Sequence, residues 1–421
     1  MPCPDRMKGD YKMASIQKRG NAYRVTVSNG RDIHGKQLIE TATFHPDPER
    51  TPKQNQKALE IFALEFEQKV KSGKYLDGEK ITFQAFSDTW LSDYAAGHLE
   101  ATTIDIYKIH LKQHIIPAIG HLKLAKIQPL HLNKLYNTML QERRDGKEGG
   151  YSPTTVKKIH ALISSIMSTA VKWNILLDNP CERVSPPKQI RDVNDIKFFT
   201  LEECSTFLDA VDADLAAGHI KLQHKVFFHL ALFCGMRRGE LIALEWADFD
   251  FNKNTVNINK STGIVDGKAI TKLPKNKTSI RMVSVPAPVM TLVRQYQKEQ
   301  YKYRLSLGSY WKGDSYVFIQ DDGSQMYPST PYRVFKKVLN RYNQNADAPL
   351  PAIPLHGLRH TSATLLISQN IDVRTVSGRL GHAQTSTTMN IYSHQLKKMD
   401  EKAADTLSGL FQKNKESLTK C

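Results

Sequence analysis

The chain has 421 residues, of which 40% are hydrophobic and 24% charged, and these ordinary globular proportions exclude disordered and collagen-like proteins. Lysine and arginine number 59 against 42 acidic residues, so the formal net charge is +17 and nucleic acid is the most economical partner. No run of about 18 apolar residues is present, which argues against a membrane protein. Composition leaves a basic enzyme with evenly spread charge as the alternative.

The cysteines and histidines indicate neither a disulfide framework nor a metal site. Five cysteines, Cys3, Cys181, Cys204, Cys234 and Cys421, form no C-x-x-C pair, which argues against disulfides and a thiolate zinc site. No H-E-x-x-H or comparable cluster occurs among the 15 histidines, so neither a metal nor another cofactor is expected. The polar N-terminus lacks the apolar core of a signal peptide, and we therefore expect a cytoplasmic protein.

The first part of the chain is predicted to be a small mixed module. Two alternating segments, 23–27 and 38–44, predict the strands of a β-hairpin. Between 52 and 71 apolar residues recur at helical spacing, namely Leu59, Phe62, Ala63 and Phe66. The sequence therefore predicts a hairpin-and-helix module over residues 1–75.

Residues 80–180 are predicted to be almost entirely helical. Thr82 is placed to cap the first of four short helices, and Ser152-Pro153 opens the fourth. The second is expected from about 102 to 114, and the third from about 129 to 143. We expect these helices to form a compact bundle.

The last domain, residues 195–421, is predicted to be mixed but mostly helical. Thr200 and Glu203 form a capping box that opens its first helix. Strands are expected around 256–258 and 281–285, and helices return after them. The whole chain is therefore predicted to be a multidomain α+β protein, mainly α-helical with small β-sheets.

Arg237 is the first candidate for chemistry in this domain. Gly235 can end the preceding apolar helix, which puts Arg237 at a helix junction, where its rigid guanidinium fork suits a phosphate. Arg238 competes for the same role, and a pair of solvated arginines is the alternative. Glu240 is expected to hold an arginine or a helix end, without reacting itself.

Three histidines and a second arginine follow near the end of the domain. His356 and Arg359 are three residues apart, so a helix places them side by side. A metal bound by His356 and His360 is the alternative, but no third ligand is suggested. Asp372 is expected to cap a short helix that Gly381 ends, which places His382 at a helix terminus.

Two further residues, Lys275 and Tyr392, become candidates only in combination with these arginines and histidines. Lys275 lies in a polar turn that leads into a strand, and a lysine there is usually a solubilising charge. If the turn overhangs DNA, Lys275 could donate a proton to a backbone oxygen. Tyr392 lies close to a chain end, where a tyrosine usually serves packing.

Taken together and in this order, the arginines, lysine, histidines and tyrosine resemble those of the tyrosine recombinases, the phage integrase family. The matching strings are Gly235-Met236-Arg237-Arg238-Gly239-Glu240, the lysine turn before Arg281, His356-Gly357-Leu358-Arg359-His360, Leu380-Gly381-His382 and Tyr392-Ser393-His394. The match covers roughly Thr200 to Lys402. The upstream bundle and module resemble the family's DNA-binding domains in shape and position only.

The resemblance implies a set of catalytic residues. The family's two arginines fall on Arg237 and Arg359, its lysine on Lys275, its histidines on His356 and His382, and its nucleophile on Tyr392. In the family a threonine commonly follows the lysine, whereas here Asn276 does. Lys277 therefore stays open as the alternative proton donor.

The chemistry of these side chains suits cleavage of a phosphodiester without a metal. Such cleavage needs a nucleophile, charge stabilisation on the phosphoryl oxygens and a proton for the leaving oxygen. The tyrosine would attack, the arginines would clamp the non-bridging oxygens, and the lysine would protonate the departing 5′ hydroxyl. His356 would assist proton removal from the tyrosine, and His382 would add a hydrogen bond. A 3′-phosphotyrosyl ester would conserve the bond energy, so rejoining would need no ATP.

The resemblance also implies function, domain roles and partners. It implies a site-specific DNA recombinase that integrates or excises a mobile element. Residues 1–75 would bind arm sites, 80–180 core sites, and 195–421 would catalyse. Four protomers would act on two double-stranded DNA sites, with an excisionase or a host DNA-bending protein as possible partners. The tail beyond Tyr392 would dock on a neighbouring protomer or fold back on its own.

Two other functions remain to be weighed. A type IB topoisomerase shares the phosphotyrosine chemistry but acts as a monomer, and the small N-terminal module and long tail argue against it. A non-enzymatic DNA-binding regulator is the alternative from another class. The complete set of six side chains argues against the regulator, and a covalent DNA adduct would exclude it.

Overall fold

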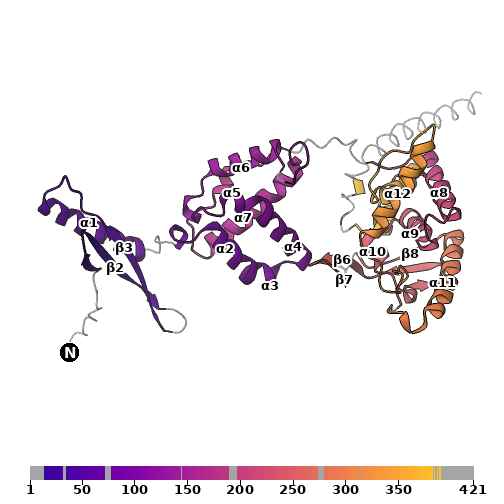
Figure 1. Ribbon diagram of the computed structural model, residues 1–421, viewed down its shortest axis with the longest axis horizontal. Coiled ribbons are helices and arrows are strands. Elements are labelled where there is room, and N and C mark those ends of the chain that lie inside the picture. Colours follow the sequence, from indigo (N-terminus) through magenta and orange to yellow (C-terminus); the bar gives the residue numbers. More distant parts are fainter. Residues whose placement is uncertain are drawn as a thin grey trace, which may run out of the picture. The chain divides into compact units, whose positions relative to one another are not determined.

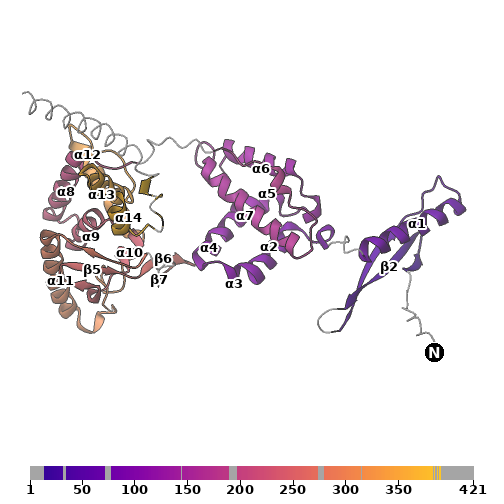
Figure 2. The same ribbon diagram turned by 180° about the vertical axis from the view of Figure 1, so that it is seen from behind.

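The computed structural model describes residues 14–31, 35–71, 77–143, 145–188, 197–273, 279–313, 315–382, 384, 386 and 388–389. The chain divides into two compact units, Met1–Gln189 and Ile190–Cys421, both drawn in Figures 1 and 2. Helices predominate and the sheets are small and antiparallel, which confirms the predicted fold class. None of the described helices is long and apolar enough to cross a membrane.

The N-terminal part of the first unit is a three-stranded antiparallel sheet packed against one helix (Figure 1). Its elements are β1 (Ser15–Arg19), β2 (Ala22–Arg31), β3 (Gln37–Phe44) and α1 (Pro52–Lys71). Val25 and Val27 of β2 form a core with Leu59 and Phe66 of α1. The sequence does not predict β1, because all its residues are exposed and it lacks the alternation of a half-buried strand.

The rest of the first unit is a helical bundle with its own hydrophobic core. Its helices are η1 (Asp77–Glu79), α2 (Phe83–Thr89), η2 (Trp90–Ala95), α3 (Ala96–His98), α4 (Ala101–His110), η3 (Leu111–Ile115), α5 (Ile116–Ile119), η4 (Leu124–Lys126), α6 (Pro129–Gln141), α7 (Pro153–Lys172) and η5 (Pro180–Arg183). As predicted, the side chains of Thr82 and Ser152 cap α2 and α7. The second predicted helix does not end near 114 but continues to Ile119. Pro117 lies in the first turn of α5, where a missing N–H is tolerated.

The second unit combines helices with two small antiparallel sheets, in the strand orders β4-β5-β8 and β6-β7. Its elements are α8 (Leu201–Ala216), α9 (Leu222–Phe233), α10 (Arg238–Ile242), η7 (Trp246–Asp248), β4 (Phe249–Asp250), β5 (Thr255–Ile258), β6 (Ser261–Val265), β7 (Lys268–Lys272), β8 (Arg281–Ser284), α11 (Ala287–Leu307), η9 (Gly308–Tyr310), α12 (Thr330–Asn345), α13 (Gly357–Ser368) and α14 (Val373–Leu380). The two predicted strands are β5 and β8. The β6–β7 hairpin was not predicted, although the Asp266-Gly267 dipeptide at its turn is a hairpin signal and both residues have positive φ.

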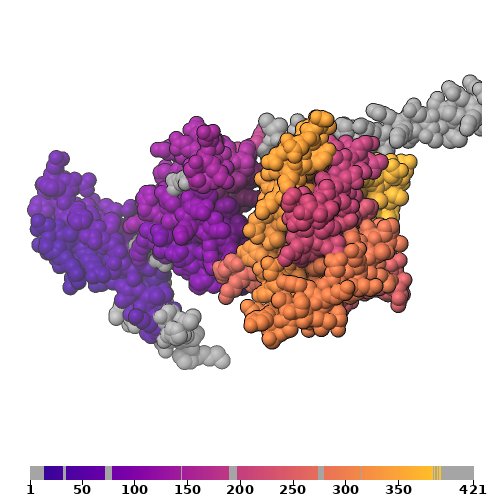
Figure 3. Space-filling view, turned by 45° about the vertical axis from the view of Figure 1, so that its right-hand side comes forward, coloured from indigo at the N-terminus to yellow at the C-terminus, as the bar shows by residue number. Residues whose placement is uncertain are grey.

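The central helix of the second unit is α9, which packs against α8, α10, α11, α12 and α13. Most of its residues are buried, which explains why its sequence is apolar nearly all round. Figure 3 shows α8 and α12 side by side on the outside of the unit, where Arg341 Nε donates to Asp214 Oδ1 at 2.8 Å. The C-terminal end of α9 leads directly into the segment that carries Arg237.

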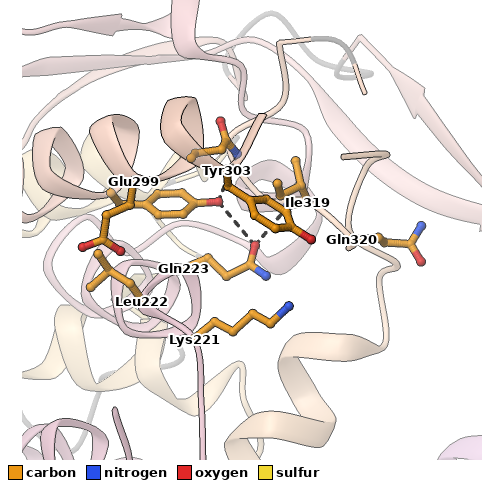
Figure 4. Close-up of a pocket in the computed structure, with 9 residues that line it drawn as sticks. Lys221, Leu222, Gln223, Glu299, Tyr303, Ile319 and Gln320 are labelled. Atoms are coloured by element: carbon orange, nitrogen blue, oxygen red, sulfur yellow. Dashed lines mark hydrogen bonds between the residues drawn. The ribbon is translucent and has the colours of Figure 1, made fainter. Parts of the chain in front are cut away.

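A cavity of about 250 Å³ lies beside the first turn of α9 (Figure 4). In its wall, Gln223 Oε1 accepts hydrogen bonds from the Ile319 N–H at 3.1 Å and the Tyr296 hydroxyl at 3.4 Å. These bonds tie α9 to α11 and to the segment that contains Ile319, so the polar groups serve the packing of the unit. The 12 residues of α9 span about 18 Å, which separates this cavity from Arg237 at the other end of the helix.

Candidate active site

Arg237 lies at the tight junction between α9 and α10, as the sequence predicts. Gly235 has a φ of +62°, a left-handed conformation that favours glycine. A side chain at this position would also meet Leu380 Cδ2 at 2.6 Å. Gly235 therefore lets the chain turn sharply while α14 packs closely against it, and Arg237 becomes the N-cap residue of α10.

Two elements far apart in the sequence hold the Arg237 side chain. Its Nη1 donates to Glu240 Oε1 at 2.8 Å, and its Nη2 donates to the carbonyl oxygen of Gly381 at 3.0 Å. Glu240 Oε2 also accepts from the Arg237 backbone N–H at 2.9 Å, so Glu240 holds an arginine and a helix end together. The Arg237 side chain remains 37% exposed and lines a cavity, which leaves part of it open to a ligand. Arg238, its competitor in the sequence, is exposed.

The first turn of α13 brings Arg359 and His356 to the same place. Arg359 is 2% exposed, and its Nη1 donates to the carbonyl oxygen of Gly235 at 2.7 Å, directly beside the Arg237 segment. His356 is the N-cap residue of α13, and its ring meets that of His360 edge to face with 4.9 Å between centroids. Burial, followed by the charges of Arg359 and Arg237, lowers the pKa of His356 below its usual value.

His382 reaches the cluster from the end of α14. Gly381 has a φ of +67° and ends this helix, and Asp372 caps its start, both as predicted. The His382 Nδ1 lies 2.7 Å from Thr388 Oγ1. Burial, followed by the charges of Arg359 and Arg237, lowers the pKa of His382 to about 4, so its imidazole is neutral at neutral pH.

Four of the six predicted site residues therefore lie together, two arginines and two neutral imidazoles at or next to the ends of α10, α13 and α14. Such a cluster can bind an anionic phosphate, donate hydrogen bonds to its oxygens and accept a proton. An adjoining cavity of about 400 Å³ is lined by Arg237, Arg238 and His356.

Two predicted site residues, Lys275 and Tyr392, and the alternative Lys277 lie outside the described residues, as does the tail after Tyr392. The lysine turn connects β7, which ends at Lys272, to β8. Within the described ranges, no group of three or more His, Cys, Asp or Glu side chains is arranged to hold a metal ion.

Sequence reasoning missed one member of the cluster, Arg281. Its guanidinium lies against Glu240, and its charge contributes to the lowered pKa of His382 after burial and the charges of Arg359 and Arg237. The sequence shows Arg281 only as the first residue of a strand. Its partner Glu240 is 41 residues away along the chain, and no local sequence pattern predicts the contact between them.

Two family models match separate parts of the chain. The phage integrase family model matches residues 197–399, and the N-terminal SAM-like domain of phage integrases matches residues 82–140. The ICEBs1 integrase of Bacillus subtilis is 32% identical over 270 residues, which cover 64% of this chain and 69% of that protein. The chain belongs to the phage integrase family of tyrosine recombinases. It is a site-specific DNA recombinase of the prophage or integrative-element type, and it binds DNA.

Further known proteins are similar to this recombinase in sequence or in fold. A XerC-like tyrosine recombinase of Caldanaerobacter subterraneus is 29% identical over 420 residues, covering 95% of this chain and 99% of that protein. The integrase of the transposon Tn1549, solved with circular intermediate DNA, has a TM-score of 0.61 at 16% identity, covering 77% of this chain and 100% of that one. A lambda integrase dimer bound to a core site has a TM-score of 0.53 at 16% identity and covers 90% and 94%. The two structures share the fold.

Proposed function

We propose that Arg237, Arg359, His356 and His382, with Lys275 and Tyr392, carry the cleavage and rejoining chemistry of this recombinase. The observation that supports this assignment is the convergence of the first four side chains at one place. Arg237 bonds the carbonyl of Gly381, which precedes His382, and Arg359 bonds the carbonyl of Gly235. A partly exposed and a buried guanidinium thus lie beside two uncharged imidazoles.

In the proposed reaction, the Tyr392 phenol oxygen attacks the scissile phosphorus and displaces the 5′ oxygen. The two arginines stabilise the charge that develops on the non-bridging oxygens. His356, neutral in the free protein because its pKa is lowered, accepts the phenolic proton, and His382 donates a hydrogen bond to the phosphate. Lys275 protonates the leaving 5′ oxygen. Attack by a new 5′ hydroxyl on the 3′-phosphotyrosyl ester rejoins the strand and releases the tyrosine, without ATP.

The proton donor can be identified by changing the leaving group. Lys275→Ala should slow cleavage sharply on a normal substrate, whereas Lys277→Ala should mainly weaken DNA binding. A substrate with sulfur in place of the leaving 5′ oxygen should restore cleavage by Lys275→Ala, because a thiolate departs without protonation. Cleavage rates of both variants on both substrates decide the matter. If the sulfur substrate restored cleavage by Lys277→Ala and not by Lys275→Ala, Lys277 would be the proton donor.

We further propose a division of labour among three parts of the chain. Residues 14–71 and 77–188 have separate hydrophobic cores, and the four clustered site residues all lie in the second unit. Residues 1–75 would bind arm sites, 80–180 would bind core sites and 195–421 would catalyse. On two DNA sites four protomers would assemble, and an excisionase or a host DNA-bending protein would act on that assembly.

A fragment that begins at Lys80 tests this division and the assembly together. It should bind and cleave core-site DNA, lose binding to arm sites, and form complexes of four protomers with two core sites. Gel-shift affinities for each type of site and complex masses from light scattering provide the readout. A folded fragment that fails to bind core sites would contradict the domain assignment, and complexes of two protomers would contradict the tetramer.

A further inference from the structure

Arg281 is a buried charge whose three guanidinium nitrogens all donate hydrogen bonds, and it has no role in the chemistry described so far. It begins β8, and its side chain is 7% exposed. Its Nη1 and Nη2 donate to Glu240 Oε1 at 3.1 Å and Oε2 at 2.9 Å, a two-pronged ion pair. Its Nε donates to the carbonyl oxygen of Arg379 at 2.7 Å. Such a buried charge is costly unless its partners are well placed.

The same carboxylate holds Arg237. Glu240 is 5% exposed and accepts from Arg237 through both oxygens, so Arg281, Glu240 and Arg237 form a continuous row of alternating charge. Burial alone would raise the pKa of Glu240. The hydrogen bonds and charge of Arg281, ahead of those of Arg237, outweigh it and hold the pKa below its usual value, so Glu240 is ionised.

An ionised Glu240 that paired with Arg237 alone would slow the reaction. The carboxylate would cancel the charge of the arginine and repel an incoming phosphate. With Arg281 in place the row carries one net positive charge, and the partly exposed end of that row is Arg237. Arg281 thus neutralises the charge of the Glu240 carboxylate from the buried end of the row.

Arg281 also fixes the backbone around the cluster. A side chain at Gly381 would meet Arg281 Nη1 at 2.7 Å, so the end of α14 lies directly on the guanidinium, next to His382. The Arg281 Nη1 further donates to the carbonyl oxygen of Ser279 at 3.2 Å, at the C-terminal end of the lysine turn. One side chain therefore connects α10, α14 and the chain that follows Lys275.

We propose that Arg281 is a positioning residue for strand cleavage: it neutralises Glu240, so that Arg237 keeps its charge available for the scissile phosphate. The inference rests on the proposed function, in which Arg237 contacts that phosphate. Arg281 itself touches neither the DNA nor the reacting atoms.

The test measures the single-turnover cleavage rate on a nicked core-site substrate at saturating protein, and DNA affinity separately. Arg281→Met removes the charge but keeps most of the side-chain volume. We expect cleavage about 10–100-fold slower, as for other partners that orient a reactive group, with DNA affinity changed less than about threefold. Arg281→Lys, which keeps the charge, should lie between this variant and the wild type.

A second substitution separates charge compensation from a structural role. In the double variant Arg281→Met with Glu240→Gln, no carboxylate opposes Arg237, and the amide oxygen can still accept one of the two hydrogen bonds from Arg237. We expect this variant to cleave faster than Arg281→Met, whereas a purely structural role predicts a further loss. Arg341→Met is the matched control, because it also removes an arginine paired with a buried carboxylate of the second unit, and should leave the rate unchanged.

The outcomes distinguish the inference from the proposed function. Wild-type cleavage by Arg281→Met, or a double variant slower than Arg281→Met, would overturn the inference. If Arg281→Met does not fold, the double variant decides: cleavage near wild type supports the inference, and cleavage as slow as that of Arg237→Lys overturns it. Wild-type cleavage by Arg237→Lys would overturn the proposed function instead.

Discussion

Replacing Tyr392 with phenylalanine should abolish the covalent bond between protein and DNA. On a nicked suicide substrate the wild-type chain should become attached to the 3′ end of the cut strand, because the short 5′ fragment diffuses away and cannot reverse the reaction. Tyr392→Phe keeps the ring and removes only the hydroxyl, so DNA binding should survive while the adduct disappears. Denaturing gel electrophoresis of labelled substrate detects the adduct.

The control for this experiment is Tyr310→Phe, which removes the hydroxyl of an exposed tyrosine in the same unit. It should form the adduct at the wild-type rate. An adduct that persists in Tyr392→Phe would place the nucleophile elsewhere. Cleavage that depends on added magnesium would contradict the metal-free mechanism.

Replacing either clamping arginine with lysine should slow cleavage by about 10²–10³-fold while DNA binding is largely kept. Lysine preserves the positive charge but lacks the planar fork that bonds two oxygens at once. The reason for choosing lysine is the burial of Arg359, since alanine would leave a cavity and remove the donor to the Gly235 carbonyl. Arg237→Lys and Arg359→Lys thus test the chemistry with little disturbance of the fold.

The measurement is the rate of adduct formation at saturating protein, with affinity for uncut core-site DNA determined in parallel. Arg294→Lys serves as the control, because Arg294 also donates to a backbone carbonyl, that of Phe251, but on α11. Its cleavage rate should match the wild type. A loss of DNA affinity that accounts for the whole loss of cleavage in Arg237→Lys would assign Arg237 to binding alone.

The sequence by itself determined the features that depend on neighbours along the chain. Capping by Thr82, by Thr200 with Glu203 and by Asp372 follows from side chains that reach a backbone N–H two or three residues away. Gly381 ends α14 for an equally local reason, its left-handed backbone. The order of the short motifs also sufficed to recognise the family, which the comparisons confirm.

The tertiary structure decided what joins distant segments. The bond from Arg237 to Gly381 spans 144 residues, that from Arg359 to Gly235 spans 124, and that from Arg281 to Glu240 spans 41. None of these contacts leaves a periodic pattern in the sequence, because each forms only when helices and strands that are distant along the chain pack together. The local sequence therefore identifies Arg237 and Arg359 through their motifs. The contact between the buried Arg281 and the Glu240 carboxylate depends on the packing of distant segments, so only the tertiary structure reveals it.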